Sequence, residues 1–166
     1  MVQVRVLGVA LDAARQHIVL LKPLADETGE GRVLPIWIGE QEATSILIAL
    51  GGDHAPRPLT LDLMVAVFGS LDATVERIEV VRIEEGTFYA LLTLATPAGP
   101  IVLDARPSDA IGLAVRVDAP LHVADAVMDE AGIPAEMVEH HDSADDEKLE
   151  EFKKFLDEVD PEDFQG

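Results

Sequence analysis

Apolar and polar residues alternate along residues 2–39, which is the pattern of strands that bury one face. The alternation predicts three strands, over residues 2–11, 17–24 and 32–39. In the first strand the apolar positions change phase beside Gly8, which indicates a β-bulge. The next segment, EQEATSILIAL at 40–50, has two acidic residues in its first turn and ends before a glycine pair, so it predicts a helix.

The second half of the chain repeats this order of elements. A Pro-rich connector (53–58) precedes a helix at 61–71, strands at 74–86, 87–95 and 100–105, a helix from Ser108, a short strand at 120–124 and a helix at 125–132. Aligning Ala43 with Ala110 superimposes the halves at an offset of 67 residues. We therefore expect an α+β fold whose duplicated strand-strand-strand-helix units form mainly antiparallel sheets packed with helices. Strands such as YALLTLA are apolar on both faces, so helices or a second subunit should sandwich the sheets.

The pattern divides the chain into three parts. Residues 1–136 form the predicted domain, residues 137–147 an acidic linker, and residues 148–166 a short amphipathic helix and tail. The apolar residues of this last part fall on one helical face: Leu149, Phe152, Phe155, Leu156 and Val159. A helix this short is marginal alone, so the segment 148–160 should dock on its own domain, a second subunit or another protein.

Composition excludes several classes of protein. The 166 residues include no cysteine, so disulfides, thiolate zinc sites and cysteine nucleophiles are excluded. No apolar run approaches the ~20 residues of a membrane span, and the N-terminus lacks the basic segment of a signal peptide. We therefore expect a cytoplasmic protein with no membrane partner.

The net charge of −20 argues against tight electrostatic binding of a phosphate backbone. Residues 139–166 carry 12 acidic and 3 basic groups, and the remaining chain carries 20 acidic and 9 basic groups. Both parts are thus acidic. Eight of the nine basic residues outside the tail are arginines, so a local arginine cluster remains an alternative.

Two Arg-Pro corners, RPLTLDL and DARPSDA, precede the helices at 61 and 108. Thr60 and Ser108 suit N-cap positions, and an aspartate in each first turn complements the helix dipole. Helix capping does not explain Arg57 and Arg106, because positive charge is disfavoured at a helix N-terminus. Each arginine should therefore have an anionic partner, either a phosphate or one of the nearby carboxylates of Glu42, Asp62, Asp104 and Asp109.

These corners carry the candidate functional residues. The predicted catalytic residues are Asp62, Asp104 and Asp109, and the predicted phosphate ligands are Arg57, Arg106, Thr60 and Ser108. The predicted ligands of a Mg²⁺ or Mn²⁺ ion, which prefers carboxylate oxygens, are Asp62, Asp104 and Glu42. Carboxylates are abundant here, so a chance cluster is the alternative. The five histidines lack ligand spacing and are expected to be structural or solvated, and Trp37 is expected in the core or at an interface.

Four segments, LPIWIGEQEA, RPLTLDL, GTFYALL and DARPSDAIGLAVRV, resemble in their order and spacing the bifunctional nuclease family (domain of unknown function 151). The resemblance covers residues 2–135, and the tail EEFKKFLDEVDPEDF is similar to the extension of actinobacterial-type members. It implies a homodimer and, as described for plant members, endonucleolytic cleavage of DNA and RNA with little sequence preference. Some relatives carry a segment associated with UvrB/UvrC-type interactions, to which the C-terminal helix could be analogous.

The first corner departs from the family pattern at one position. Family members commonly read Arg-Pro-Leu-Thr-His-Asp-Leu, whereas this chain has Leu61 in the place of the histidine. Leucine cannot exchange a proton, so a proton-transfer role at this position is lost. The sequence leaves two hypotheses: a metal-assisted phosphodiesterase, and a non-catalytic oligomeric or regulatory module whose C-terminal helix docks a partner.

Overall fold

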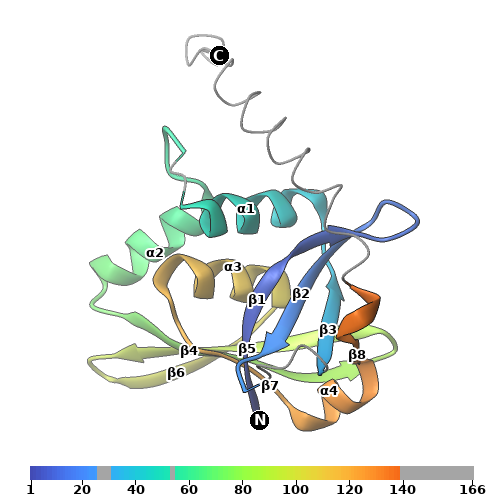
Figure 1. The fold of residues 1–166 in the computed structure, drawn as a ribbon. Coiled ribbons are helices and arrows are strands. Elements are labelled where there is room, and N and C mark those ends of the chain that lie inside the picture. The colour runs from blue at the N-terminus through green and yellow to red at the C-terminus, as the bar shows by residue number, and fades with distance from the viewer. Residues whose placement is uncertain (26–30, 53–54, 139–166) are drawn as a thin grey trace.

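Eight strands form one sheet in the part of the chain that the computed structural model describes, residues 1–25, 31–52 and 55–138 (Figure 1). The strands are β1 (Val2–Leu11), β2 (His17–Pro23), β3 (Arg32–Trp37), β4 (Thr74–Glu84), β5 (Thr87–Thr96), β6 (Gly99–Ala105), β7 (Leu121–Val123) and β8 (Ile133–Pro134). Their order in the sheet is β6-β5-β4-β7-β1-β2-β3-β8. The pair β4–β7 is parallel and the other pairs are antiparallel.

The predicted α+β class and the mainly antiparallel pairing are confirmed, but the two halves share a single sheet. The short strand β7 pairs with β1 on one side and with β4 on the other, and it thereby joins the halves. The β-bulge is confirmed as well, because the register of β1 against β2 shifts between Val6 and Gly8.

Four helices accompany the sheet in the described residues: α1 (Glu40–Gly51), α2 (Thr60–Ser70), α3 (Pro107–Val117) and α4 (Asp125–Ala131). Figure 1 shows α1, α2 and α3 gathered on one side of the strands. Helix α1 contacts β1 and β2, while α3 contacts β4, β5 and α1. None of the described helices is long and apolar enough to cross a membrane.

The duplication is visible in the order of the elements. Strands β1–β3 precede α1, strands β4–β6 precede α3, and the first helical residues, Glu40 and Pro107, are 67 positions apart. The aligned residues Ala43 and Ala110 are both buried in the same apolar cluster. This offset also makes Gly39 and Arg106 equivalent, because each is the N-cap of its helix.

The core lies between the helices and the sheet, and the opposite face is covered only in part. Leu20 and Val33, on the face away from the helices, pack against Ala135 of a 3₁₀ turn, Ala135–Met137. Strand β6 is an edge strand, and Ile101, Val102 and Leu103 on it are between 42% and 55% exposed. Both faces of β2 and β3 are therefore covered, as the sequence predicts. Within the described residues β6 is left uncovered, because α3 lies over β4 and β5. The predicted helix 148–160 and most of the predicted linker lie outside the described residues.

Candidate functional site

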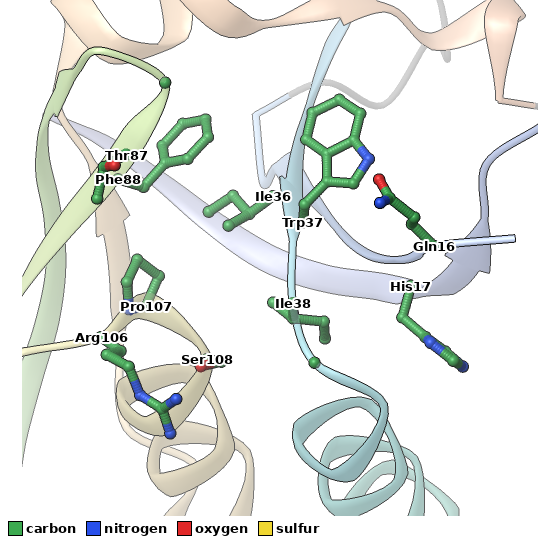
Figure 2. A pocket seen from close by; sticks show the side chains of 12 residues that line it. Gln16, His17, Ile36, Trp37, Ile38, Thr87, Phe88, Arg106, Pro107 and Ser108 are labelled. Atoms are coloured by element: carbon green, nitrogen blue, oxygen red, sulfur yellow. The ribbon is translucent and has the colours of Figure 1, made fainter. Parts of the chain in front are cut away.

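An open cleft of about 540 Å³ lies where the N-termini of α1 and α3 meet the turn between β4 and β5 (Figure 2). Its lining consists of Gln16, His17, Ile36, Trp37, Ile38, Gly39, Gly86, Thr87, Phe88, Arg106, Pro107 and Ser108. Figure 2 shows Arg106, Pro107 and Ser108 on the wall formed by α3, Trp37 on β3 itself, and Gln16 and His17 beyond β3. The cleft therefore joins residues from both halves of the chain.

The two helices reach the cleft by their N-caps, Gly39 and Arg106. Gly39 has no side chain and the guanidinium of Arg106 has no acceptor atom, so neither N-cap residue caps the first-turn N–H groups, which contribute positive partial charge beside the cleft. Pro107 at the first position of α3 needs no hydrogen-bond partner for its nitrogen and has the φ angle that a helix start requires. A helix N-terminus is a common place for an anion to bind.

Arg106 is held between two carboxylates from the two halves of the chain. Its Nε donates to Asp109 Oδ2 at 2.7 Å and its Nη2 to Asp109 Oδ1 at 3.0 Å. Its Nη2 also lies 3.1 Å from Glu42 Oε1. The hydrogen bonds to Asp109 chiefly, together with Glu42, raise the pKa of Arg106 above its ordinary value. The expected anionic partner of Arg106 is thus present, although 66% of the arginine side chain remains exposed.

The electrostatic character of the cleft differs from that of the chain. Arg106 carries a charge, and none of the described residues that line the cleft is acidic. Glu42 and Asp109 contact the guanidinium of Arg106 without lining the cleft. The lining is thus less acidic than the chain as a whole, whose net charge is −20, although two carboxylates contact the one cation in it.

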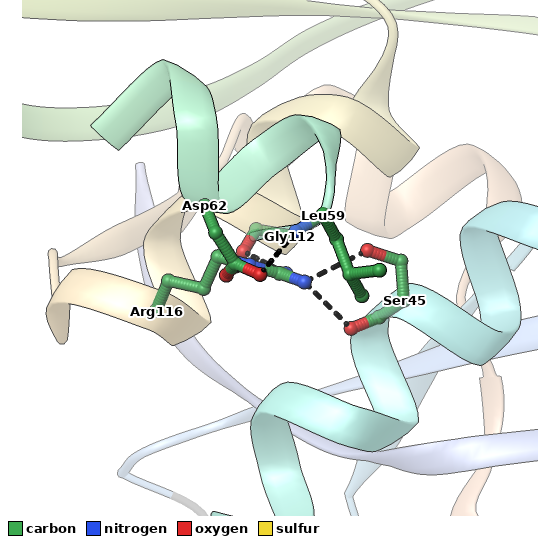
Figure 3. Close-up of polar contacts among 5 residues, drawn as sticks. All are labelled: Ser45, Leu59, Asp62, Gly112 and Arg116. Carbon is green, nitrogen blue, oxygen red and sulfur yellow. Dashed lines mark hydrogen bonds and ion pairs between the residues drawn. The ribbon is translucent and has the colours of Figure 1, made fainter. Parts of the chain in front are cut away.

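The first Arg-Pro corner has a different role. Asp62 Oδ1 accepts a hydrogen bond from Arg116 Nε at 2.7 Å, and its Oδ2 accepts one from the backbone N–H of Leu59 at 2.8 Å (Figure 3). Arg116 also donates to the backbone oxygens of Gly112 and Ser45 and to the Ser45 hydroxyl. With 7% of its side chain exposed, Arg116 joins α1, α2 and α3. Asp62 therefore lies in a structural network rather than at the cleft.

The remaining residues of that corner lie outside the cleft too. Arg57 and Thr60 are exposed and do not line it. The N-cap predictions are wrong: Leu59 precedes α2 and Arg106 precedes α3, so Thr60 and Ser108 are already helical. The reason is that Asp62 caps α2 from within its first turn, while Pro107 occupies the first position of α3. Ser108 is buried and lines the cleft.

The predicted metal ligands are not brought together. Asp104 lies on β6, and its neighbour Leu103 pairs with the core residue Leu92, so Asp104 points to the face away from the helices. Glu42 contacts Arg106, and Asp62 contacts Arg116. Among the residues that the structure describes, no three histidine, aspartate or glutamate side chains are grouped to hold a metal ion. In the described structure two members of the set, Glu42 and Asp62, are paired with different arginines and Asp104 faces away, so a metal site at these residues stays a prediction.

Sequence reasoning missed several residues of the cleft. Trp37 is not in the core: it is 53% exposed on the cleft wall. His17 and Gln16 line the same wall, where the chain enters β2. The sequence position of Trp37 could have indicated its exposure. Trp37 is the last residue of β3, and a residue at the end of a strand need not follow the burial pattern of the residues before it.

The departure at position 61 does not affect the cleft. Leu61 is 8% exposed and belongs to the core, where a Cβ at Gly112 would collide with its side chain. It does not line the cleft. The loss of a proton-transfer group at Leu61 is therefore not a loss from the site at Arg106.

Comparison with known proteins agrees with the resemblance in the sequence. The model of the bifunctional nuclease domain matches residues 20–136. An uncharacterised protein of Mycobacterium tuberculosis (strain H37Rv) is 40% identical over 167 residues, 99% of this chain and 98% of the relative. Bifunctional nuclease 1 of Oryza sativa subsp. indica is 30% identical over 115 residues, which are 68% of this chain and 34% of the rice protein. On these matches the chain belongs to the bifunctional nuclease domain family.

Proposed function

We propose that this protein is a nuclease that hydrolyses phosphodiester bonds of DNA and RNA with little sequence preference, and that the cleft at Arg106 is its site. The charge of the cleft carries this proposal. The described lining includes Arg106 and no carboxylate, although the chain as a whole has a net charge of −20. A cation at two adjacent helix N-termini favours a phosphate over other ligands.

Arg106 is the residue expected to bind the scissile phosphate. Asp109 and Glu42 engage its Nε and Nη2, and Nη1 donates to none of the described residues. The two N–H groups of Nη1 are thus available to a phosphate oxygen, and a guanidinium fixed in advance stabilises the charge that develops in the transition state. The Ser108 hydroxyl, on the same wall, is a second donor. Asp109 acts in this proposal as a positioning residue for Arg106.

The dependence on Mg²⁺ or Mn²⁺ stays a prediction. Mg²⁺ is often bound by one or two carboxylates together with water and substrate phosphates. Glu42 and Asp109 are the carboxylates next to the cleft, but both already contact Arg106, and a metal ion would have to compete with the guanidinium for them. The described residues therefore do not fit a ready metal site.

One observation favours the alternative, a non-catalytic oligomeric or regulatory module. Two carboxylates already neutralise Arg106, as expected of an arginine whose role is to hold α1 and α3 together. In that case the docking of a partner by residues 148–160 would be the function, and those residues lie outside the described part. A homodimer and a cytoplasmic location remain proposals under either hypothesis, and the exposed apolar residues of β6 are a surface that a second copy could cover.

Cleavage of fluorescent single-stranded DNA and RNA by the full-length protein, with Mg²⁺, Mn²⁺ or EDTA, tests the proposal. Arg106→Ala should abolish cleavage, whereas Arg57→Ala, the same change at the other corner and outside the cleft, is the matched comparison. Circular dichroism would verify that both variants are folded. Equal cleavage by the wild type and both variants would indicate a contaminating nuclease, and no cleavage by any of them would support the non-catalytic module.

A further inference from the structure

Trp37 is an exposed aromatic side chain on the wall of the cleft. It is the one tryptophan of the chain, it ends β3, and 53% of its surface is accessible. Exposed tryptophan is unfavourable unless the ring has a partner, since a large apolar surface then stays in water. Its position beside Gln16 and His17 places this surface next to polar groups in a hollow (Figure 2).

The orientation of the indole is fixed by the loop between β1 and β2. The Trp37 Nε1–H donates to Asp12 Oδ2 at 3.0 Å. The other oxygen of Asp12 accepts hydrogen bonds from the backbone N–H groups of Ala14 and Gln16, both at 2.8 Å. The single polar atom of the indole is therefore engaged by Asp12, and the surface that remains accessible is the apolar π-system. A fixed ring is suited to stacking because it loses little side-chain freedom when a ligand binds.

The two walls of the cleft offer complementary chemistry. Arg106 and Ser108 lie on the wall formed by α3, and Trp37 lies on the wall formed by the end of β3 (Figure 2). The volume of about 540 Å³ is within the range of sites that take one small molecule. A nucleotide has a planar base at one end and a phosphate at the other, and it matches this pairing of an aromatic ring with a cation.

We propose that Trp37 is the platform on which an unpaired nucleobase stacks while Arg106 binds the adjoining phosphate. The proposal rests on the proposed nuclease function and adds to it a residue that selects single-stranded segments, since the bases of a duplex are already stacked and their faces are not available. Stacking on an aromatic ring tolerates any base, because every base has a π-face. The platform is thus compatible with cleavage of low sequence preference.

The competing occupant of Trp37 is a second copy of the chain. The surroundings favour the base, because the ring borders a hollow that contains an arginine, a histidine and a glutamine. Arg106 is paired with the carboxylates of Asp109 and Glu42, and burying charged groups costs free energy unless all their hydrogen bonds are satisfied. A second copy would have to bury Arg106 or leave the cleft open beside the ring.

Tryptophan fluorescence tests the proposal directly, because the whole signal of the chain comes from Trp37. The full-length protein would be titrated in EDTA, which limits metal-dependent cleavage, with a single-stranded thymidine oligonucleotide, a blunt DNA duplex and inorganic phosphate. We expect saturable quenching by the oligonucleotide and little by the duplex or by phosphate alone. Trp37→Leu should weaken binding of a labelled oligonucleotide, measured by anisotropy, by roughly 5- to 100-fold. Trp37→Phe, which keeps a ring, should retain most of it.

The outcomes separate this inference from the proposed function. Quenching without any cleavage would support base stacking on Trp37 in a protein that binds nucleic acid, and it would contradict the proposed nuclease function. Cleavage without any change in Trp37 fluorescence, or unchanged oligonucleotide binding by Trp37→Leu, would contradict the role of Trp37 in base stacking. The proposed nuclease function would still hold. A concentration-dependent blue shift of the emission that the oligonucleotide does not reverse would assign the ring to a second copy and would also overturn the proposal.

Discussion

Arg116 Nε donates a hydrogen bond to Asp62 Oδ1 at 2.7 Å, across 54 positions of the sequence. The same guanidinium reaches Gly112 in its own helix and Ser45 in α1 (Figure 3). One arginine thereby joins the N-terminus of α2 to the C-terminal half of α3 and the middle of α1. These helices position the N-caps that border the cleft, so the network supports the site from the middle of α1 and from the C-terminal half of α3.

We expect Arg116→Met to lower the free energy of unfolding by about 2 to 4 kcal/mol, because the substitution removes the hydrogen bonds that a buried guanidinium donates to Asp62 Oδ1 and to the Ser45 hydroxyl. The upper limit is modest because 38% of the Asp62 side chain is exposed to water. Urea unfolding monitored by circular dichroism would measure the loss. Arg82→Met, which removes an exposed pair with Glu84 and an exposed contact with the Tyr89 ring, is the comparison at a surface arginine and should change stability by less than about 1.5 kcal/mol. Equal effects of the two substitutions would contradict the structural role of Arg116.

Two glycines in neighbouring helices should respond oppositely to alanine. A Cβ at Gly112 would collide with Leu61 of α2, whereas a Cβ at Gly69 would meet no atom within 4 Å. Gly112→Ala should therefore destabilise the protein by about 1 to 3 kcal/mol through overpacking. Gly69→Ala should stabilise it by about 0.5 to 1 kcal/mol, since alanine restricts the unfolded chain and favours the helix. Thermal unfolding of both variants measures these changes, and a stabilised Gly112→Ala would show that the Leu61 side chain moves aside at little cost.

The pattern of apolar residues predicted the order of the elements but not the single sheet in which β7 joins the two halves. Periodicity gave the strands, the bulge beside Gly8 and the duplication, because each depends on neighbours in the sequence. The unfavourable position of Arg106 at a helix N-terminus likewise predicted an anionic partner, either a phosphate or a nearby carboxylate, and Asp109, three residues away on the same turn, is such a carboxylate. In these cases, interactions between residues close in the sequence determine the structure.

The parts that could not be predicted depend on long-range contacts. Nothing in the sequence near Asp62 indicates that Arg116 is its partner, so the carboxylate resembled a free ligand. The same holds for Trp37, whose exposure is decided by the loop that contains Asp12. The two Arg-Pro corners look alike in sequence, yet the arginine is the N-cap itself at Arg106 and precedes the N-cap by two residues at Arg57.

Asp109→Asn should change substrate binding and cleavage in opposite directions. The substitution removes one of two negative charges next to Arg106, so the affinity for an oligonucleotide should rise several-fold at low salt. It also replaces a bidentate ion pair with a weaker contact, so the guanidinium is held less firmly and kcat should fall. Steady-state cleavage kinetics would show a lower KM together with a lower kcat. A fall in kcat with an unchanged or higher KM would indicate that Asp109 is not a positioning residue.

The contact between Asp12 and Trp37 should make the tryptophan fluorescence sensitive to acid. The hydrogen bond from Trp37 chiefly, with those from the Gln16 and Ala14 backbone, lowers the pKa of Asp12 below its ordinary value of 3.8. Because the folded-state pKa is depressed, the stabilising contribution is fully present above 3.8 and is lost as the pH falls below it through the lowered pKa. An acid titration of the emission should therefore show a transition below pH 3.8, and Asp12→Asn, which keeps an acceptor oxygen without the charge, should abolish it. The same transition in Asp12→Asn would assign it to global unfolding, and the indole would then not be held by the Asp12 carboxylate.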